Sequence, residues 1–251
     1  MNCVKTLLII TLIPLFYSCE YIDSINKTGK VISTEISLNE FDKIDIESPY
    51  NIVLIQDTLY YIYIEGMDYL VDDIIIEQTD NTIKLNHKTP GIIQKKKMPH
   101  LYIHSKHFSS ITSNSPGELT NVDTLREKTL SVVINGRGTY FDSNLCIDTE
   151  SFLLRAFGEI NTGIHTISGK TLKASFIMEG CTYALAEDLQ SDHADFTHKS
   201  AADCTVTTNK TLNVIIYSSG NLLYKGTPEI TFTRGESSML NSTGKLKAIQ
   251  K

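Results

Sequence analysis

The sequence contains no tryptophan and none of the short signatures on which the common enzyme classes depend. It has no phosphate-binding loop, no Gly-x-Ser-x-Gly nucleophile elbow and no zinc signature, which excludes the enzymes built on those motifs. Sugar-binding platforms often rely on tryptophan, so a platform in this chain would have to use some of its 12 tyrosines. Tyr60, Tyr61 and Tyr63 form a cluster of this kind, although most tyrosines are expected to pack in or along strands.

Cysteine is scarce and has no metal-binding spacing. Beyond Cys3 and Cys19 the chain keeps Cys146, Cys181 and Cys204, an odd number without a Cys-x-x-Cys pair. This pattern is neither a disulfide framework nor a zinc site. We expect the three residues to be small buried hydrophobic side chains, and we predict no metal and no cofactor.

Positive charge is in the minority. Without residues 1 to 18 the chain has 22 basic and 29 acidic residues, a net charge of −7. A surface with this balance is a poor partner for nucleic acid, which we exclude. The one basic cluster, Lys95-Lys96-Lys97, lies between Gly91 and Pro99 and is expected to be a solvated loop.

The N-terminus has the pattern of a secretory signal. Lys5 precedes the apolar run from Leu7 to Tyr17, which is too short to span a membrane, and Ser18-Cys19 follows. A small residue before cysteine resembles the bacterial lipobox, which implies a signal peptide over 1–18 and acylation of Cys19. The alternative is a conventional signal followed by an ordinary cysteine. We therefore predict an outer-membrane lipoprotein of the cell envelope, held to the membrane by its lipid, with surface or periplasmic exposure left open.

The region after a polar tether over 19–38 alternates between apolar and polar residues. Five short runs rich in Ile, Val and Tyr predict strands within 39–107: FDKIDIE, YNIVLIQ, YYIYIEG, DIIIEQ and TIKLNH.

From residue 108 to 251 the sequence repeats with a period near 20. The corner positions of the repeat follow one another at spacings of 15 to 22 residues: Gly117, Gly138, Gly158, Gly180, Ala202, Gly220 and Gly235. Three alternating residues precede most of them, as in Leu130/Val132/Ile134, Phe152/Leu154/Ala156, Leu172/Ala174/Phe176 and Ala194/Phe196/His198. A strand followed by a tight corner at this period predicts an all-β fold, a parallel β-solenoid. Glycine at the corner would permit positive φ and close approach of neighbouring coils, which is our interpretation of Gly220.

Several segments resemble the head GIN domain family of auto-transporter adhesins, found in lipoproteins of Bacteroidetes. They are Phe41-x-x-Ile44-x-Ile46, the NIVLIQ strand, the glycine-punctuated coils and Tyr224-x-Gly226-x-Pro228. The resemblance implies a right-handed single-stranded parallel β-helix over 39–251, continued or capped by the N-terminal strands. It also implies an adhesive role at the cell envelope.

The residues that follow the corners form a candidate polar column: Glu118, Thr139, Glu159, Cys181, Asp203, Asn221 and Glu236. One interpretation is a solvated face that binds a ligand, a surface or a protein without catalysis, and this is the function we predict. The alternative is a β-helical lyase or hydrolase of acidic polysaccharides, whose acids would act as acid/base or calcium ligands. In this column the nearest acids are expected two coils, or about 10 Å, apart, which is marginal for paired acid/base work.

Histidines are the remaining candidates. In HLYIHSKH, His100 and His104 are four residues apart, which on a strand is about 13 Å. This distance is too long for both side chains to coordinate one metal ion. His198 occupies a predicted core position, where we expect it to bond to the backbone of a neighbouring coil.

Overall fold

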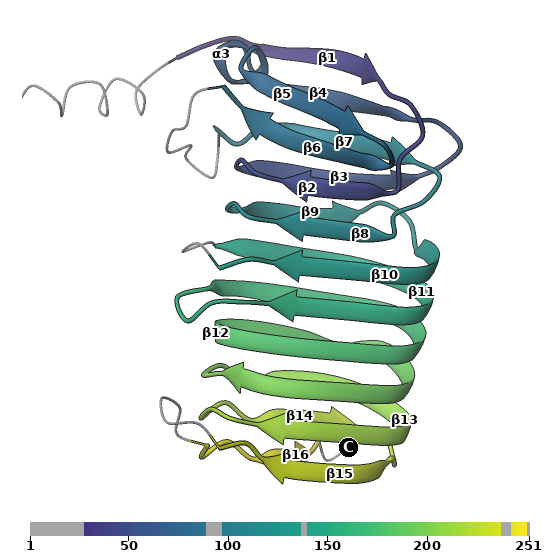
Figure 1. The fold of residues 1–251 in the computed structure, drawn as a ribbon, viewed down its shortest axis with the longest axis vertical. Coiled ribbons are helices and arrows are strands. Elements are labelled where there is room, and N and C mark those ends of the chain that lie inside the picture. The colour runs from purple at the N-terminus through teal and green to yellow at the C-terminus, as the bar shows by residue number, and fades with distance from the viewer. Residues whose placement is uncertain (1–27, 89–96, 137–139, 237–241, 250–251) are drawn as a thin grey trace, which may run out of the picture.

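The computed structural model describes residues 28–88, 97–136, 140–236 and 242–249. The predicted signal peptide and Cys19 therefore lie outside the described residues, as do Gly138 and Thr139. The chain is nearly all β and forms a β-solenoid of about six turns, which confirms the predicted fold (Figure 1). No helix in the described part of the chain is long and apolar enough to cross a membrane.

The strands belong to one 16-stranded sheet system. Their bounds are β1 Val31–Ser37, β2 Lys43–Ile46, β3 Tyr50–Gln56, β4 Tyr61–Met67, β5 Ile74–Thr79, β6 Thr82–His87, β7 His100–Ser105, β8 Ser110–Ser113, β9 Gly117–Asn121, β10 Leu125–Ile134, β11 Phe141–Ala156, β12 Thr162–Ser200, β13 Cys204–Ile216, β14 Leu222–Lys225, β15 Glu229–Arg234 and β16 Leu246–Ala248. One short helix, α3, spans Asp68–Val71.

Each coil crosses two faces of the solenoid. The β2 face stacks, in order, β2, β8, the C-terminal halves of β10 and β11, two segments of β12, the C-terminal half of β13, and β15. The β3 face stacks β3, β9, the N-terminal part of β11 and, further along, β14 and β16. Strands bend continuously from one face to the other at one edge and meet in turns at the opposite edge, on the right and left of Figure 1 respectively.

Parallel backbone pairing sets the length of each coil. Between β11 and β12, Ser143 pairs with His165, a separation of 22 along the sequence. Between β12 and β13 the coil is shorter, because Asp195 pairs with Asn213 at a separation of 18. Both lengths are close to the predicted period, which is thereby confirmed.

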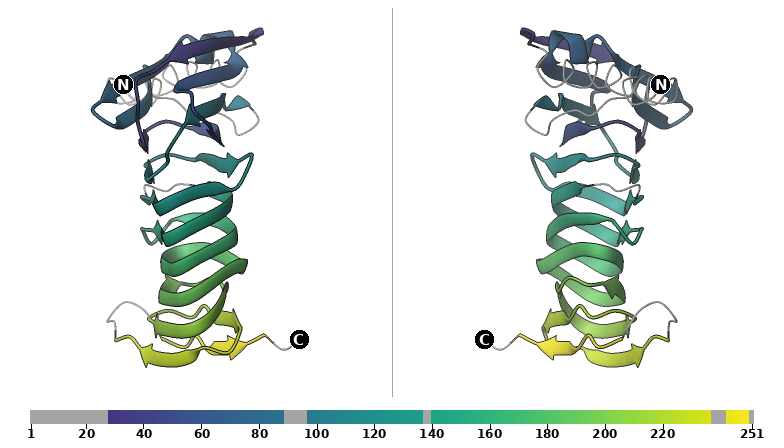
Figure 2. Two further views of the ribbon diagram at one scale, coloured as in Figure 1. Left: turned by 90° about the vertical axis from the view of Figure 1, so that its right-hand side faces the viewer. Right: turned by 90° about the vertical axis from the view of Figure 1, so that its left-hand side faces the viewer.

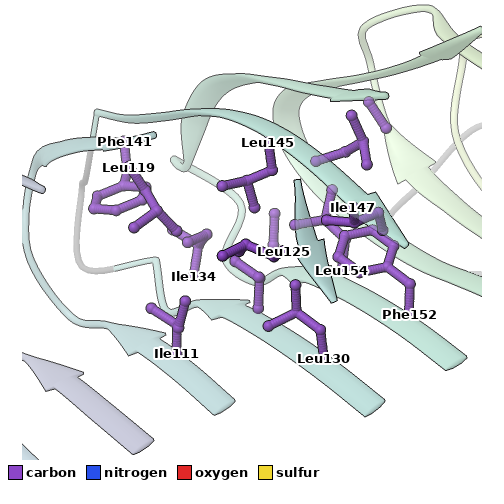
Figure 3. Close-up of a cluster of buried hydrophobic side chains, with 14 of the residues drawn as sticks. Ile111, Leu119, Leu125, Leu130, Ile134, Phe141, Leu145, Ile147, Phe152 and Leu154 are labelled. Carbon is purple, nitrogen blue, oxygen red and sulfur yellow. The ribbon is translucent and has the colours of Figure 1, made fainter. Parts of the chain in front are cut away.

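Apolar side chains stack in the interior from coil to coil (Figure 3). The rings of Phe152 and Phe176 meet edge to face at 6.1 Å, and those of Phe176 and Phe196 stack at 5.1 Å. The predicted Leu172/Ala174/Phe176 triad is shifted by one inward position, because Leu172 is 56% exposed and Met178 is buried instead. Backbone pairing with the preceding coil fixes which residues point inward, and it selects Ala174, Phe176 and Met178.

The N-terminal strands both continue and cap the solenoid. The five predicted runs are confirmed as β2 to β6, of which β2 and β3 extend the two faces by parallel pairing. The antiparallel pairs β1–β4, β4–β7 and β5–β6 close this end, where Figure 2 shows the chain spreading beyond the width of the coils. The last part of the stretch expected as a tether is itself a strand, β1.

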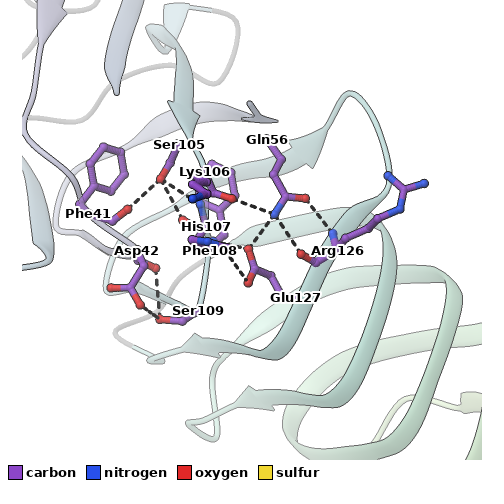
Figure 4. A network of polar contacts seen from close by, with 10 residues as sticks. All are labelled: Phe41, Asp42, Gln56, Ser105, Lys106, His107, Phe108, Ser109, Arg126 and Glu127. Carbon is purple, nitrogen blue, oxygen red and sulfur yellow. Dashed lines mark hydrogen bonds and ion pairs between the residues drawn. The ribbon is translucent and has the colours of Figure 1, made fainter. Parts of the chain in front are cut away.

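A polar network joins the capping strands to the first coil (Figure 4). The side-chain amide of Gln56 donates to the carbonyl oxygens of Lys106 and Arg126 and to Oε1 of Glu127, and its Oε1 accepts the Arg126 N–H. Glu127 Oε1 also accepts the N–H of Phe108 at 2.8 Å. Gln56 thus satisfies backbone groups from two other segments, which fixes β3 against β7 and β10.

Candidate functional site

The predicted corner residues do not form one row. One row contains Gly158, Gly180 and Gly136, the last of which was not a predicted corner. A Cβ on Gly136 would lie 2.9 Å from the Cα of Gly158, and one on Gly180 would lie 2.6 Å from the Gly158 carbonyl oxygen. A second row contains Ala202 and Gly220, and its next member is Gly244, which the spacing did not reveal. The remaining two predicted corners lie elsewhere: Gly117 begins β9, and Gly235 packs on the ring of Tyr217.

The two rows need glycine for different reasons. Gly158 and Gly180 have φ of +106° and +70°, which L side chains rarely adopt. Gly220 is not among the positive-φ glycines of the described residues, so this part of its interpretation is wrong. It is required because a Cβ there would collide with the carbonyl oxygens of Ala202 and Ser200. Close approach of coils, the other predicted reason, holds.

The predicted polar column is also divided. Asp203 and Asn221 stand on adjacent coils, where Asp203 Oδ1 accepts both the backbone N–H of Asn221 at 2.7 Å and its side-chain amide at 2.8 Å. On the next coil Lys245, whose N–H donates to Asn221 Oδ1, follows this pair in place of Glu236. Glu159 lies in an exposed turn between β11 and β12. The column fails because the coils differ in length, so a fixed offset from glycine does not give a fixed place on the surface.

Glu118 has a different neighbour from the one expected. It lies in β9 on the outside of the β3 face, in register with Asn51 on one side and Asp142 on the other. Two carboxylates thus stand on adjacent coils, although Asp142 is not a member of the predicted column. Asp142 Oδ1 accepts the N–H of Ile164 at 2.9 Å, so one of its oxygens already has a backbone partner.

His198 is a structural residue, as predicted. Its side chain is fully buried, its Nε2 lies 3.1 Å from the carbonyl oxygen of Asn221 on the next coil, and its Nδ1 accepts the N–H of Ser200. These contacts assign the proton to Nε2. Burial lowers the pKa of His198, so the ring is neutral at pH 7.

A second buried histidine, His165, was not singled out by sequence. Its Nδ1 lies 2.9 Å from Ser143 Oγ on the preceding coil, and burial lowers its pKa to about 4. Position 165 is an inward position between Gly163 and Ile167 on the strand, and this alternation was the signal available. Neither histidine faces solvent, which removes both from surface chemistry.

The three cysteines differ from one another. Cys204 is buried, as predicted, and burial raises the pKa of its thiol to about 12. Cys181 is exposed and Cys146 partly so, which corrects the expectation for these two. Cys181 precedes Thr182, which is the inward residue at this point of β12. Within the described ranges no group of three or more His, Cys, Asp or Glu side chains is placed to hold a metal ion.

A large concave surface lies along the bend edge and was not predicted. We call it the bend groove; it has a volume of about 610 Å³ and is open to solvent. Charged side chains of both signs line it: Arg126, Glu127, Lys128, Asp148, Glu150, Lys170 and Asp192. Lys170 Nζ lies 3.2 Å from Asp148 Oδ2 on the preceding coil, and Lys210 Nζ lies 2.8 Å from Asp192 Oδ2. Opposite charges therefore alternate between adjacent coils of the solenoid.

Known proteins agree with this architecture. Crystal structures of a "putative adhesin" from Bacteroides fragilis and one from Parabacteroides merdae share the fold, with TM-scores of 0.73 and 0.62 at 20% and 13% identity. The two alignments include 88% and 89% of this chain, and each includes 98% of the crystallised chain. A "putative lipid binding protein" from Parabacteroides distasonis has a TM-score of 0.62 at 17% identity, with 89% and 98% covered.

No curated protein matches the chain significantly. The family model described as "putative auto-transporter adhesin, head GIN domain" matches residues 40–228, from the residue before the first core phenylalanine to Pro228. The match spans every capping strand except β1 and most of the coils, so the chain belongs to the head GIN domain family of auto-transporter adhesins.

Proposed function

We propose that the chain is a non-catalytic lipoprotein of the cell envelope that binds a ligand or surface through the outside of its solenoid. The bend groove is the observation that carries this proposal. It is open, runs across several coils, and offers charges of both signs in a fixed order. Such a surface suits many weak contacts with a large partner, whose strength grows when many copies stand on one membrane.

The chemistry of the groove favours binding over turnover. Asp148 and Asp192, two of its acids, each form an ion pair with a lysine. A carboxylate in such a pair is poorly placed to exchange a proton with a substrate. Exposed ion pairs of this kind contribute little to stability, about 0 to 1 kcal/mol each. Their side chains can therefore exchange partners with a charged ligand at low cost.

Attachment to the membrane rests on the sequence. The lipobox-like Ser18-Cys19 would place acyl chains on Cys19, a short stretch before β1 begins at Val31. In the fold, β1 belongs to the capping end, so the anchor would tie that end of the column to the outer membrane. The coils would then project from the membrane with the bend groove accessible along their side.

An adhesion assay tests the groove. The chain from residue 20 onward, which contains every described residue, is coupled to beads and its retention on coatings of collagen and of acidic polysaccharides is measured. The double reversal Lys128→Glu/Lys170→Glu should reduce retention at least about tenfold. The matched control Lys43→Glu/Lys247→Glu changes the same net charge at exposed positions outside the groove and should retain binding. Equal retention of both variants would refute the groove, and no retention of the wild type on any coating would refute adhesion.

A second measurement tests the alternative that the chain is a polysaccharide lyase or hydrolase. The reason for this test is that two acids, Glu118 and Asp142, stand on adjacent coils. The same protein is incubated with neutral and acidic glycans, with and without calcium, and released products are quantified. We expect no release. Reproducible turnover that is lost in Glu118→Gln or Glu159→Gln would make the chain an enzyme and overturn the proposal.

A further inference from the structure

Two segments that are far apart in the sequence lie side by side at the capping end of the β3 face. The antiparallel pair β4–β7 buries its inward side chains completely: Ile62, Ile64, Leu101 and Ile103. Alternation turns the other residues of both strands outward. Pairing places Tyr61 opposite His104 and Tyr63 opposite Tyr102, which unites the tyrosine cluster with the HLYIHSKH segment. The outward set defines the tyrosine–histidine face: Tyr61, Tyr63, His100, Tyr102 and His104.

The rings of this face are held in place. Tyr63 and Tyr102 have centroids 5.9 Å apart and planes at 54° to each other, so they form an open angle, and Tyr63 is 36% exposed. Tyr61 stacks on His104 at 4.0 Å, and His104 Nδ1 lies 2.7 Å from Asp57 Oδ2. Strand pairing holds all of these residues, and stacking and the hydrogen bond to Asp57 fix the Tyr61 and His104 rings, so a ligand would order few side chains on binding.

Polar groups border the rings on one side. A cleft of about 310 Å³ adjoins Tyr102 and is lined in part by Glu65, Lys97 and His100. Asn51 Nδ2 lies 3.4 Å from His100 Nε2, and Glu118 follows Asn51 in register on the next strand. A row of hydrogen-bonding side chains from four strands thus runs beside the aromatic row.

Charge around the face selects among ligands. Glu35 on β1 is in register with Tyr63, and Glu65 follows two residues along β4 on the same side. Both carboxylates are exposed beside the most exposed ring. A sialic or uronic acid placed on Tyr63 would meet the negative charge of Glu35 and Glu65, which outnumber the one lysine that lines the cleft, Lys97, and like charges on facing strand positions repel each other.

We propose that the tyrosine–histidine face binds a glycan made of neutral pyranose residues. A pyranose presents a flat C–H surface, which packs on an aromatic ring. Its edge carries hydroxyl groups, which need hydrogen-bond donors and acceptors beside that ring. Tyr63 and Tyr102 supply the apolar contact, while Glu65, His100 and the neighbouring row supply the hydrogen bonds. This ligand class goes beyond the adhesive function proposed above, and the face lies on a different part of the solenoid from the bend groove.

Calorimetric titration with neutral oligosaccharides selected on a glycan array tests the proposal, using the chain from residue 20 onward. Tyr63→Ala/Tyr102→Ala should weaken binding at least about tenfold. The control Tyr140→Ala/Tyr183→Ala removes two exposed tyrosines outside this face and should leave the affinity unchanged. Tyr63→Phe/Tyr102→Phe keeps the rings and should retain most of the affinity, which separates ring contact from a loss of folding. Acidic analogues should bind more weakly, and Glu35→Gln/Glu65→Gln should reduce that discrimination.

Three results would overturn the proposal: no neutral glycan bound by the wild type, affinity unaffected by the Tyr63/Tyr102 double substitution, or the same face binding phosphatidylcholine vesicles in place of glycans. The bend-groove reversal Lys128→Glu/Lys170→Glu should leave this affinity intact. If the groove reversal reduces bead retention but the tyrosine variant keeps its glycan affinity, this proposal fails alone. If the tyrosine variant loses glycan affinity but the groove reversal keeps bead retention, the proposed function of the groove fails alone.

Discussion

Gln56 Nε2 and Glu127 Oε1 lie 2.7 Å apart and connect strands separated by 71 residues of sequence. The contact is the centre of the network that joins the capping strands to the first coil (Figure 4). Through it, the part of the chain that carries the tyrosine–histidine face is fixed in position relative to the bend groove.

Removal of this amide should therefore loosen the junction. Gln56→Ala removes the partner of the Arg126 N–H, of the carbonyl oxygens of Lys106 and Arg126 and of Glu127 Oε1. Water can reach most of these groups, so we expect a loss of about 1 kcal/mol in the free energy of unfolding. Urea denaturation measures it, with the exposed Gln190→Ala as control. A loss no larger than that of the control would show that the network does not secure the junction.

Acid should destabilise the coils through their buried histidines. The pKa of His165 falls to about 4 in the folded chain, against about 6.5 when unfolded, so below pH 6.5 the unfolded state binds a proton that the folded state does not. Stability is complete above about pH 7 and decreases as the pH falls toward 4; His165 alone accounts for about 2 kcal/mol at pH 5. His198, whose pKa is also lowered, adds in the same direction.

Unfolding at pH 7.5 and pH 5 checks this expectation. His165→Gln should show a smaller pH-dependent loss than the wild type, while His100→Gln, at an exposed position, should show the full loss. Identical pH dependence in all three proteins would contradict the assignment.

Close approach between coils should make Gly220 intolerant of any side chain. Gly220→Val places a Cβ against the carbonyl oxygens of Ala202 and Ser200 on the preceding coil, so backbone must move. We expect a loss of about 3 kcal/mol or more. Lys210→Ala removes only an exposed pair with Asp192 and should cost under about 1 kcal/mol. Equal melting temperatures for the two variants would refute this account of the glycine.

Membrane attachment should depend on Cys19. Cys19→Ala removes the predicted acylation site while leaving all described residues unchanged, so the fold should persist and the protein should leave the membrane fraction. Fractionation with immunodetection measures the distribution. Continued sedimentation of the folded variant with membranes would show that another element binds them.

Local pattern predicted the strands, because burial of one face imposes an alternation that is visible within a single short run. YNIVLIQ and TIKLNH were predictable for this reason, and the repeat of glycine corners indicated a solenoid. The register between coils was not predictable, since it depends on how much chain each bend consumes. Leu172 matches the core pattern in sequence, yet pairing with the coil before it places that side chain outside.

The candidate sites depend on strand order, which spacing does not contain. Tyr63 and Tyr102 are distant in sequence and meet because β7 inserts between β4 and β3. Glu118 and Asp142 meet because the coil between them is longer than the step from Gly117 to Gly138 suggested. Composition could identify the side chains available, but only the path of the backbone brings them together.

The stacking of coils through parallel backbone pairing also determines how the molecule responds to force. The hydrogen bonds between coils run along the long axis, so tension between the capping end and the last coil loads them one row at a time. Each coil contacts only its neighbours, and its release is therefore a separate event. A coil such as that from Ser143 to His165 frees about 70 Å of chain when it is fully extended. The column should thus lengthen in steps under tension, absorbing mechanical work between an anchored base and a surface held at the far end.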